Sequence, residues 1–457
     1  MYIKYKTMNQ TSSWATNAIF YHIYPLGFCN APSHADASSQ PIERINKLSE
    51  WLPHIKNLGC NALYLGPLFE STNHGYDTAD YYNVDKRLGT NQTLKNLSLQ
   101  LHQEGIKLVL DGVFNHVGRD FWAFRDLKTN RTASRFKDWF TGIDFNRKSP
   151  YGDNFMYDCW SGYYNLVKLN LKNEEVKSHI FGAVSMWMDE FDIDGLRLDV
   201  AEVMDKGFLA ELGVFCKQKK PNFWLMGEMI HGDYNQLANE RMLDSATNYE
   251  AYKGLYSSHN NVNYFEIAYT FNRQFSEYGI YKNLHLYNFV DNHDVTRIAS
   301  ILQNDAHLFP TYALLFGMPG IPSIYYGSEN AQKGLKKGSD DTVLRPSLDI
   351  VPNHLQTPIF NYIQKLAAIR HSNSALKIGR YKQLYLTHQQ FAFLRYTDTE
   401  STIVAVNSAS TSVSIKIPIN LPDGTLMKDI LTGNTTKVNR KEITINIPPF
   451  GACIFTA

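Results

Sequence analysis

Short apolar runs alternate with helical stretches along most of this 457-residue chain. Eight of these runs have the length and composition of buried strands: residues 19–25, 62–69, 107–114, 195–200, 223–228, 242–248, 287–291 and 321–326. Helical patterns lie between them, for example at 41–58, 94–104, 176–191, 305–316 and 357–371. Repeated βα units bury both faces of a parallel sheet, and eight such units close into a barrel. The sequence therefore predicts an α/β fold, a (β/α)8 TIM barrel.

Two segments depart from this alternation. Residues 118–169 are too long for an ordinary βα loop and are rich in Asp, Asn, Gly and aromatic residues, which predicts an irregular subdomain after strand three. After residue 371, short alternating runs at 391–396, 402–407, 412–417 and 442–447 predict a C-terminal antiparallel β-sandwich domain. We therefore assign 1–117 and 170–374 to the barrel, 118–169 to the inserted subdomain and 375–457 to the C-terminal domain.

The charge balance narrows the kinds of partner. The chain has 45 Lys and Arg against 44 Asp and Glu, so its overall charge gives no reason to expect nucleic acid or an anionic membrane as a partner. Five scattered cysteines form no CxxC or Cys/His cluster, which favours a reducing compartment. Residues 1–16 lack the apolar core of an export signal, and no run approaches transmembrane length. We expect a cytoplasmic protein with a small polar ligand.

Charged and polar side chains follow four of the predicted strands. A (β/α)8 barrel builds its active site where its strands end, and a charge at that position needs either a partner or a task. Each residue alone could be a helix cap or an ion-pair partner, but the joint pattern favours a catalytic site. The residues are Asp111, Asn115 and His116 after strand three, Arg197 and Asp199 at strand four, Glu228 at strand five, and Asp291, His293 and Asp294 at strand seven.

These strand ends resemble the motifs of the α-amylase family of glycoside hydrolases. The matching segments occur in the family's order: DGVFNH (111–116), GLRLDVAEV (195–203), GEMI (227–230) and FVDNHD (289–294). Further resemblance lies in HGYDTADYY (74–82), VKLN (167–170), MPGIPSIYYGSE (318–329) and IPPFGACIF (447–455). The resemblance covers nearly the whole chain and implies a retaining α-glycosidase that acts on α-glucan oligosaccharides.

The resemblance implies separate roles for three carboxylates. Asp199 matches the nucleophile and Glu228 the acid/base, the two carboxyls that a retaining glycosidase places about 5 to 5.5 Å apart. Asp294 matches the third carboxylate, which binds ring hydroxyls and favours the distorted sugar. We expect Arg197 to keep Asp199 ionised, and burial to keep the proton on Glu228.

Further residues match substrate-binding positions of the family. Tyr76 matches the aromatic side chain that stacks on the reacting sugar, and His116 and His293 match histidines that bind its hydroxyls. The resemblance is less strict for His74 and for Arg345 in TVLRPSLD. We interpret Asp111 as structural support for the end of strand three.

The substrate type follows from two departures from secreted starch-degrading amylases. Glu202 and Val203 stand where many of those enzymes have Lys-His, and VKLN resembles the MPKLN segment of neopullulanases, cyclomaltodextrinases and maltogenic amylases. Those relatives act on short maltodextrins, cyclodextrins and sometimes α-1,6 branches. They usually carry an extra N-terminal β domain that shapes a dimeric site, whereas about 18 residues precede strand one here. The oligomeric state therefore stays open. Preferred chain length depends on the loops around 118–169 and 250–284.

Several alternatives remain open. No cofactor is required for this chemistry, but Asn115 matches a position that binds calcium in many amylases; it could equally hydrogen-bond backbone within its loop. A transglycosylase or isomerase would use the same carboxylates, with an acceptor sugar replacing water. A non-catalytic carbohydrate-binding member of the family would be expected to have lost carboxylates that this chain retains.

Overall fold

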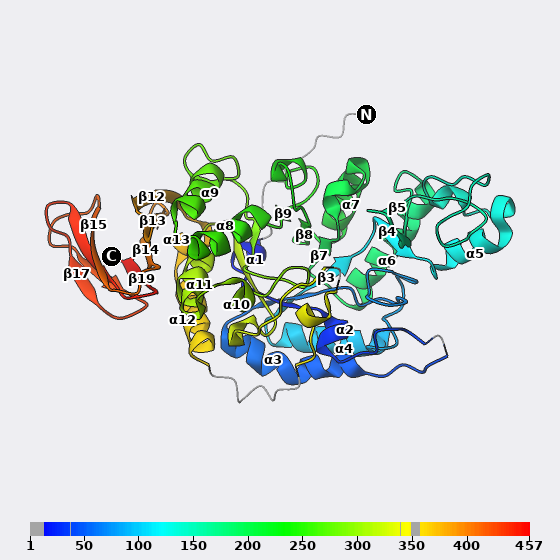
Figure 1. The fold of residues 1–457 in the computed structure, drawn as a ribbon, viewed down its shortest axis with the longest axis horizontal. Helices are drawn as coiled ribbons and strands as arrows, with labels where there is room; N and C mark the ends of the chain where they lie inside the picture. The colour runs from blue at the N-terminus through cyan, green and yellow to red at the C-terminus, as the bar shows by residue number, and fades with distance from the viewer. Residues whose placement is uncertain (1–12, 37, 339, 349–356) are drawn as a thin grey trace.

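Eight parallel strands form a closed barrel at the centre of the molecule (Figure 1). The computed structural model describes residues 13–36, 38–338, 340–348 and 357–457. The strand order is β10-β11-β1-β2-β3-β7-β8-β9, and a parallel bridge between Thr247 and Tyr287 joins the two ends. The strands are β1 (Phe20–Ile23), β2 (Ala62–Leu65), β3 (Lys107–Gly112), β7 (Gly195–Leu198), β8 (Trp224–Gly227), β9 (Ser245–Ala246), β10 (Tyr287–Asn288) and β11 (Ile321–Tyr325). All eight predicted strands are therefore confirmed.

Helices surround the barrel because the apolar strands must be covered on their outer side. The main helices are α3 (Lys47–Leu58), α4 (Asn91–Gln103), α6 (Glu174–Glu190), α7 (Lys206–Lys219), α8 (Tyr249–Asn260), α9 (Phe265–Phe275), α11 (Leu308–Gly317) and α12 (Pro358–Ser372). Short helices are α1 (Ser13–Thr16), α2 (Pro25–Phe28), α10 (Ile298–Ile301) and α13 (Ser374–Ile378). Side-chain caps set several starts: Asn173 accepts hydrogen bonds from the first turn of α6, and Asp205 from that of α7.

The sequence places two helical regions imperfectly. The helix predicted from residue 41 begins at Lys47, after a 3-10 turn at Arg44–Asn46. The segment around 250–284, expected as loop, contains α8 and α9, so that part of the expectation is wrong. The amphipathic pattern of α9, with Ile267, Ala268 and Phe271 buried, could have revealed it.

The segment after strand three contains a small antiparallel sheet and one helix. Strand β6 (Tyr163–Lys168) pairs with both β4 (His116–Gly118) and β5 (Cys159–Trp160), and α5 spans Trp122–Asn130. An ion pair between Arg119 and Asp153, with N–O distances of 2.7 and 2.8 Å, ties its loops together. Figure 1 shows this segment at the end of the molecule opposite the C-terminal strands.

The C-terminal region is an antiparallel β domain, as predicted. Its six-stranded sheet runs β12-β13-β14-β19-β16-β17, and β15 and β18 pair separately. Alternate residues of β18, namely Ile443, Ile445 and Ile447, are buried, which is the pattern of a strand with one solvated face. The strands are β12 (Arg380–Leu386), β13 (Gln390–Tyr396), β14 (Ser401–Asn407), β15 (Val413–Pro418), β16 (Leu426–Asp429), β17 (Thr435–Lys437), β18 (Glu442–Ile447) and β19 (Gly451–Thr456).

Two buried arginines, Arg370 of α12 and Arg395 of β13 in this domain, bind carbonyl oxygens at the end of α11. Arg370 Nη1 donates to the carbonyl oxygen of Phe316 at 3.0 Å, and Arg395 Nη1 donates to that of Gly317 at 2.7 Å. Cations at a helix C-terminus complement unpaired carbonyls and the helix dipole. Burial lowers the pKa of Arg370 to about 9, so the guanidinium still carries its charge at neutral pH.

No helix among the described residues is long and apolar enough to span a bilayer. The expectation that residues 1–16 hold no export signal falls mostly on residues 1–12, which lie outside the described residues.

Candidate active site

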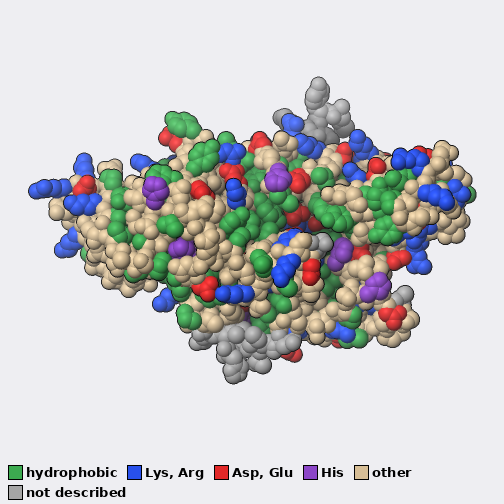
Figure 2. Space-filling model, in the orientation of Figure 1, with side chains coloured by type: hydrophobic (Ala, Val, Ile, Leu, Met, Phe, Trp, Pro, Cys, Tyr) green, Lys and Arg blue, Asp and Glu red, His purple; other side chains and the backbone are tan. Residues whose placement is uncertain are grey.

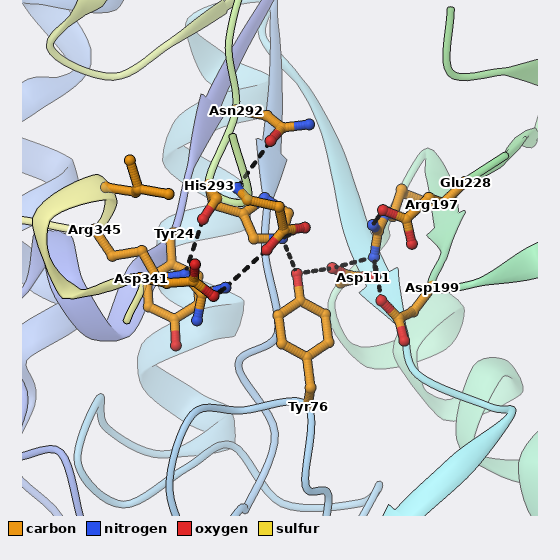
Figure 3. Close-up of polar contacts among 12 residues, drawn as sticks. Tyr24, Tyr76, Asp111, Arg197, Asp199, Glu228, Asn292, His293, Asp341 and Arg345 are labelled. Carbon is orange, nitrogen blue, oxygen red and sulfur yellow. Dashed lines mark hydrogen bonds and ion pairs between the residues drawn. The ribbon is translucent and has the colours of Figure 1, made fainter. Parts of the chain in front are cut away.

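The ends of the neighbouring strands β3, β7 and β8 bring Asp111, Asp199 and Glu228 together (Figure 3). Asp111 on β3 lies in register with Arg197 on β7. The backbone N–H of Asp199 donates to Gly112 of β3, and that of Glu228 donates to Leu198 of β7. Parallel pairing therefore fixes both carboxyls at the same end of the barrel.

Arg197 lies at the centre of this cluster and is only 3% exposed. Its Nη1 is 2.8 Å from Oδ1 of Asp199 and 3.0 Å from Oδ1 of Asp111, while its Nη2 is 2.7 Å from Oε1 of Glu228. All three carboxyls are buried. One guanidinium thus serves three carboxylates, which would leave an excess of negative charge if all three were ionised.

This excess of negative charge bears on the expectation that Arg197 keeps Asp199 ionised. Burial raises the pKa of Asp199 well above its ordinary range, and the lowering by Arg197 does not overcome it because Glu228 and Asp111 add negative charge. Burial likewise raises the pKa of Glu228, as expected. Burial and the neighbouring carboxylates thus oppose the ionisation of Asp199 that Arg197 favours, and the two carboxyls compete for protons as a pair.

The turn after Asp199 is strained and contacts Glu228. Val200 has φ of +43° and ψ of +41°, a left-handed conformation that is unusual for a β-branched residue. In this conformation its backbone N–H donates to Oε2 of Glu228 at 2.9 Å. The strained turn therefore positions Glu228 against the strand that carries Asp199.

Asp294 is held from several sides. Its Oδ2 is 3.0 Å from Nε2 of His293, and its Oδ1 is 2.8 Å from Nη2 of Arg345. Burial alone would raise the pKa of Asp294, but its contact and hydrogen bond with His293 and the positive charge of Arg345 outweigh burial and lower the pKa well below its usual range. With its side chain 32% exposed, Asp294 presents an ionised carboxylate to the cleft.

Tyr76 connects the two groups of carboxylates. Its hydroxyl donates to Oδ2 of Asp111 at 3.2 Å and also hydrogen-bonds Nε2 of His293. Tyr64 donates to the same Asp111 oxygen at 2.8 Å. With Arg197, Asp111 thus has partners for both oxygens, which agrees with the interpretation of this residue as structural support.

His116 is a buried, neutral histidine beside Asp199. Its Nε2 lies 3.8 Å from Oδ2 of Asp199 and has no hydrogen-bond partner among the described atoms. Burial lowers the pKa of His116 to about 3. His116 therefore offers an unpaired ring nitrogen next to the carboxylate proposed as the nucleophile.

The two weaker sequence matches occupy different positions. Arg345 lies in the site, where its Nε donates to the carbonyl oxygen of His293 at 3.1 Å. His74 is at the rim, with 36% of its side chain exposed and its ring centroid 6.1 Å from that of Tyr76.

Asn115 lies in the interior of the protein, next to His116. It is buried, and its Nδ2 is 3.2 Å from Nδ1 of His116. Within the described part of the chain, no group of three or more His, Cys, Asp or Glu side chains is arranged to hold a metal. Calcium binding near Asn115 stays a prediction.

Sequence reasoning missed the loop that fixes Asp294. Nζ of Lys336 donates to the carbonyl oxygen of Asp294 at 2.7 Å and lies 3.2 Å from Oδ1 of Asp341, whose Oδ2 is 3.0 Å from Arg345. Lys336, Asp341 and Arg345 thus form an ion-paired chain that reaches both the backbone and the carboxylate of Asp294. No sequence pattern distinguishes Lys336 from the neighbouring lysines Lys333 and Lys337.

A groove of about 1000 Å³ opens beside the carboxylates. The loop after β8, helices α8 and α9, and Ile280 line it. Tyr249 belongs to this lining and also accepts a hydrogen bond from Asn292 at 3.0 Å, while Asn292 accepts one from the backbone N–H of Asp294 at 2.8 Å. Figure 2 shows hydrophobic side chains gathered over α8 and α9 on this face.

Known proteins resemble this chain in both sequence and fold. Residues 23–357 match the α-amylase catalytic domain, and residues 385–457 match the α-amylase C-terminal all-β domain. The chain is 27% identical to a cyclomaltodextrinase of Geobacillus thermopakistaniensis, over 98% of this chain and 78% of that protein. It is 28% identical to the intracellular maltogenic amylase of Bacillus subtilis, over 85% of this chain and 68% of that protein.

A solved structure agrees with these sequence matches. The cyclic α-maltosyl-(1→6)-maltose hydrolase of Arthrobacter globiformis superimposes with a TM-score of 0.82 at 26% identity, covering 98% of this chain and all of that one. The family is shown by the two matched domains and by relatives that align along most of the chain. The buried carboxylate cluster agrees with it. The chain belongs to the α-amylase family and is a glycoside hydrolase.

Proposed function

We propose that this enzyme hydrolyses α-1,4-glucosidic bonds in maltooligosaccharides and cyclodextrins with retention of configuration, and that it also accepts α-1,6 linkages. The observation that carries this proposal is the sharing of one buried guanidinium by Asp199 and Glu228 on adjacent strands. A retaining glycosidase needs two neighbouring carboxyls of this kind. The relatives named cyclomaltodextrinase and cyclic α-maltosyl-(1→6)-maltose hydrolase support the substrate class.

In the first step Asp199 attacks the anomeric carbon. Its Oδ1 stays bound to Arg197, so Oδ2, which faces His116, forms the new bond. The glycosidic bond breaks as Glu228 transfers its proton to the leaving oxygen. Burial raises the pKa of Glu228, which favours its holding that proton until the transfer.

In the second step Glu228 accepts a proton from water, and the water oxygen displaces Asp199 from the anomeric carbon. The product regains the configuration of the substrate, and both carboxyls return to their starting states. The N–H of Val200 on Oε2 keeps Glu228 oriented through both steps.

The remaining residues bind the reacting sugar. Asp294, ionised at neutral pH, accepts hydrogen bonds from two ring hydroxyls and favours the distorted, oxocarbenium-like sugar. His116 and His293 bind further hydroxyls through their ring nitrogens. Tyr76 stacks on the sugar, His74 contacts it at the rim, and Arg345 acts mainly by holding Asp294.

We also propose that the enzyme works in the cytoplasm. The Bacillus subtilis relative is named intracellular, and all five cysteines are free thiols. Oligosaccharide is the expected ligand, and no nucleic acid or membrane partner is proposed.

One incubation separates the proposed hydrolase from its alternatives. The enzyme is incubated with maltotriose, maltoheptaose, cyclodextrin and pullulan, and the products are separated. Glucose and maltose from maltotriose support the hydrolase. Longer or rearranged sugars would instead identify a transglycosylase or isomerase, and a protein inactive on every substrate, with binding retained, would be a carbohydrate-binding member.

A further inference from the structure

Arg297 follows Asp294 by three residues and is completely buried. Its Nη2 donates to the carbonyl oxygen of Leu344 at 2.8 Å, and its Nη1 donates to that of Tyr326 at 2.6 Å. Both acceptors belong to the chain at or after the end of β11. A buried guanidinium is costly unless its donors are used, so these carbonyl oxygens fix where the side chain lies.

The carbonyl oxygen of Leu344 is held by two donors. Besides Arg297, the hydroxyl of Tyr325 donates to it at 2.9 Å. The guanidinium of Arg297 also lies over the ring of Tyr325, with 4.1 Å between Cζ and the ring centroid. Arg297 and Tyr325 therefore fix the peptide unit that joins Leu344 to Arg345.

Arg345 carries this constraint to Asp294. Its Nη2 is 2.8 Å from Oδ1 of Asp294, and its Nε donates to the carbonyl oxygen of His293 at 3.1 Å (Figure 3). Covalent chain and polar contacts thus close a ring through Asp294, Arg297, Leu344 and Arg345. The ring restricts the carboxylate of Asp294, because that carboxylate cannot turn without breaking a contact.

Further contacts keep Arg297 itself in place. Its backbone N–H donates to the carbonyl oxygen of Gly334 at 2.9 Å. The next residue, Ile298, donates its N–H to Oδ2 of Asp291 at 2.8 Å, and the hydroxyl of Ser328 donates to the same oxygen at 2.7 Å. Asp291 is only 1% exposed. This strand-seven carboxylate therefore joins the two loops instead of facing the cleft.

We propose that Arg297 is a positioning residue for Asp294 and acts on it through Arg345. The proposal rests on the proposed function, in which Asp294 binds ring hydroxyls and favours the distorted sugar. Arg297 is buried and does not touch the sugar. Its loss frees the peptide unit of Arg345, and Asp294 then loses the geometry that the transition state requires. Misplacing a group that acts in the transition state lowers kcat more than it changes KM.

A double-mutant cycle between Arg297 and Arg345 tests the proposal. Arg297→Lys keeps a positive charge but loses the planar fork that binds two carbonyl oxygens. The substitution is made in the wild type and in Arg345→Ala, and kcat and KM for maltotriose are measured for each protein. Arg370→Lys is the matched control, because Arg370 is also a buried arginine and binds carbonyl oxygens of Phe316 and Leu376, outside the site.

In the wild-type background, Arg297→Lys should lower kcat for maltotriose about tenfold and change KM by less than about twofold. In the Arg345→Ala background the same substitution should lower kcat by less than about twofold, because the residue through which Arg297 acts is gone. Arg370→Lys should lower the melting temperature and leave kcat at the wild-type value.

Equal losses of kcat in the two backgrounds would show that Arg297 acts independently of Arg345 and would overturn the proposal. A tenfold loss of kcat in Arg370→Lys would overturn it as well, because any weakened buried arginine would then have the same effect. If the wild type does not cleave maltotriose, the proposed function itself fails.

Tyr325→Phe replaces Arg297→Lys in the cycle if the lysine variant does not fold, because it removes only the second donor to the carbonyl oxygen of Leu344. Its loss of kcat should be about threefold in the wild type and absent in Arg345→Ala. The same loss in both backgrounds, or none in either, would overturn the proposal.

Discussion

Nη2 of Arg197 lies 2.7 Å from Oε1 of Glu228, and the same guanidinium reaches Asp199 through Nη1. The arginine therefore fixes the two carboxyls relative to each other. It cannot neutralise both together with Asp111, so part of the cost of burying these acids stays uncompensated. Active sites often keep such a cost because the chemistry needs it.

Replacing Asp199 by Asn should stabilise the protein above mildly acidic pH. The folded-state pKa of Asp199 lies above its unfolded value, so the folded state loses stability as pH rises from about 4 through the raised pKa. Asn keeps an oxygen for Arg197 without this penalty. We expect the melting temperature of Asp199→Asn to exceed that of the wild type by about 3 °C at pH 7.5.

The same comparison at low pH provides the control. Near pH 4 the carboxyl is protonated in the folded state, so the difference in melting temperature should shrink. A variant that melts below the wild type at pH 7.5 would contradict the claim that burial outweighs Arg197 at Asp199.

Replacing Lys336 by Met should weaken the binding of the sugar by Asp294. The variant loses the hydrogen bond to the carbonyl oxygen of Asp294, and Asp341 loses one of its two cationic partners. Since Asp294 acts in the transition state, we expect kcat for maltotriose to fall about tenfold with little change in KM. Lys336→Arg should recover most of the activity.

Lys333→Met is the matched control, because Lys333 pairs with Asp305 at 3.4 Å on the exposed surface of the same region. Its kinetics should equal those of the wild type. Equal losses in Lys333→Met and Lys336→Met would show that the loop tolerates no substitution, and would contradict a specific role for Lys336.

Replacing Arg395 by Met should weaken the interface between the barrel and the C-terminal domain. Arg395 donates to the carbonyl oxygens of Gly317 and Gly379 at 2.7 and 2.8 Å, and these acceptors would be left buried without partners. We expect the free energy of unfolding in urea to drop by about 3 kcal/mol. Arg380→Met, which removes an exposed ion pair with Asp398 in the same domain, should change it by less than about 0.5 kcal/mol. Similar losses in both variants would argue against the buried contacts.

The barrel could be predicted from the sequence because the alternation of apolar strands and helices is a local pattern. Each barrel strand is short, apolar and buried, and each is followed by a helical period, so eight strands can be counted without knowing their contacts. The same strand assignment predicted which carboxylates lie at the strand ends. The C-terminal strand β19 (Gly451–Thr456) appeared only as part of a motif, because it lacks the alternation that marked β18.

What the sequence did not predict depends on contacts between distant segments. Lys336 reaches Asp294 across 42 positions in the chain, and nothing near Lys336 indicates that partner. The sequence shows that Glu202 departs from the secreted amylases, but its hydrogen bonds to the loop after β8 follow only from the packing of neighbouring strand ends. The raised pKa values of Asp199 and Glu228 likewise depend on burial and on how many carboxyls surround one arginine.

In the proposed mechanism, Asp199 and Glu228 act together as nucleophile and acid/base of a retaining hydrolase. Proton NMR during the first minutes of maltotriose hydrolysis, before the product anomers equilibrate, tests it directly. We predict that the new reducing end appears first as the α-anomer, because two displacements restore the configuration of the substrate. A product that appears first as the β-anomer would rule out the two-displacement mechanism.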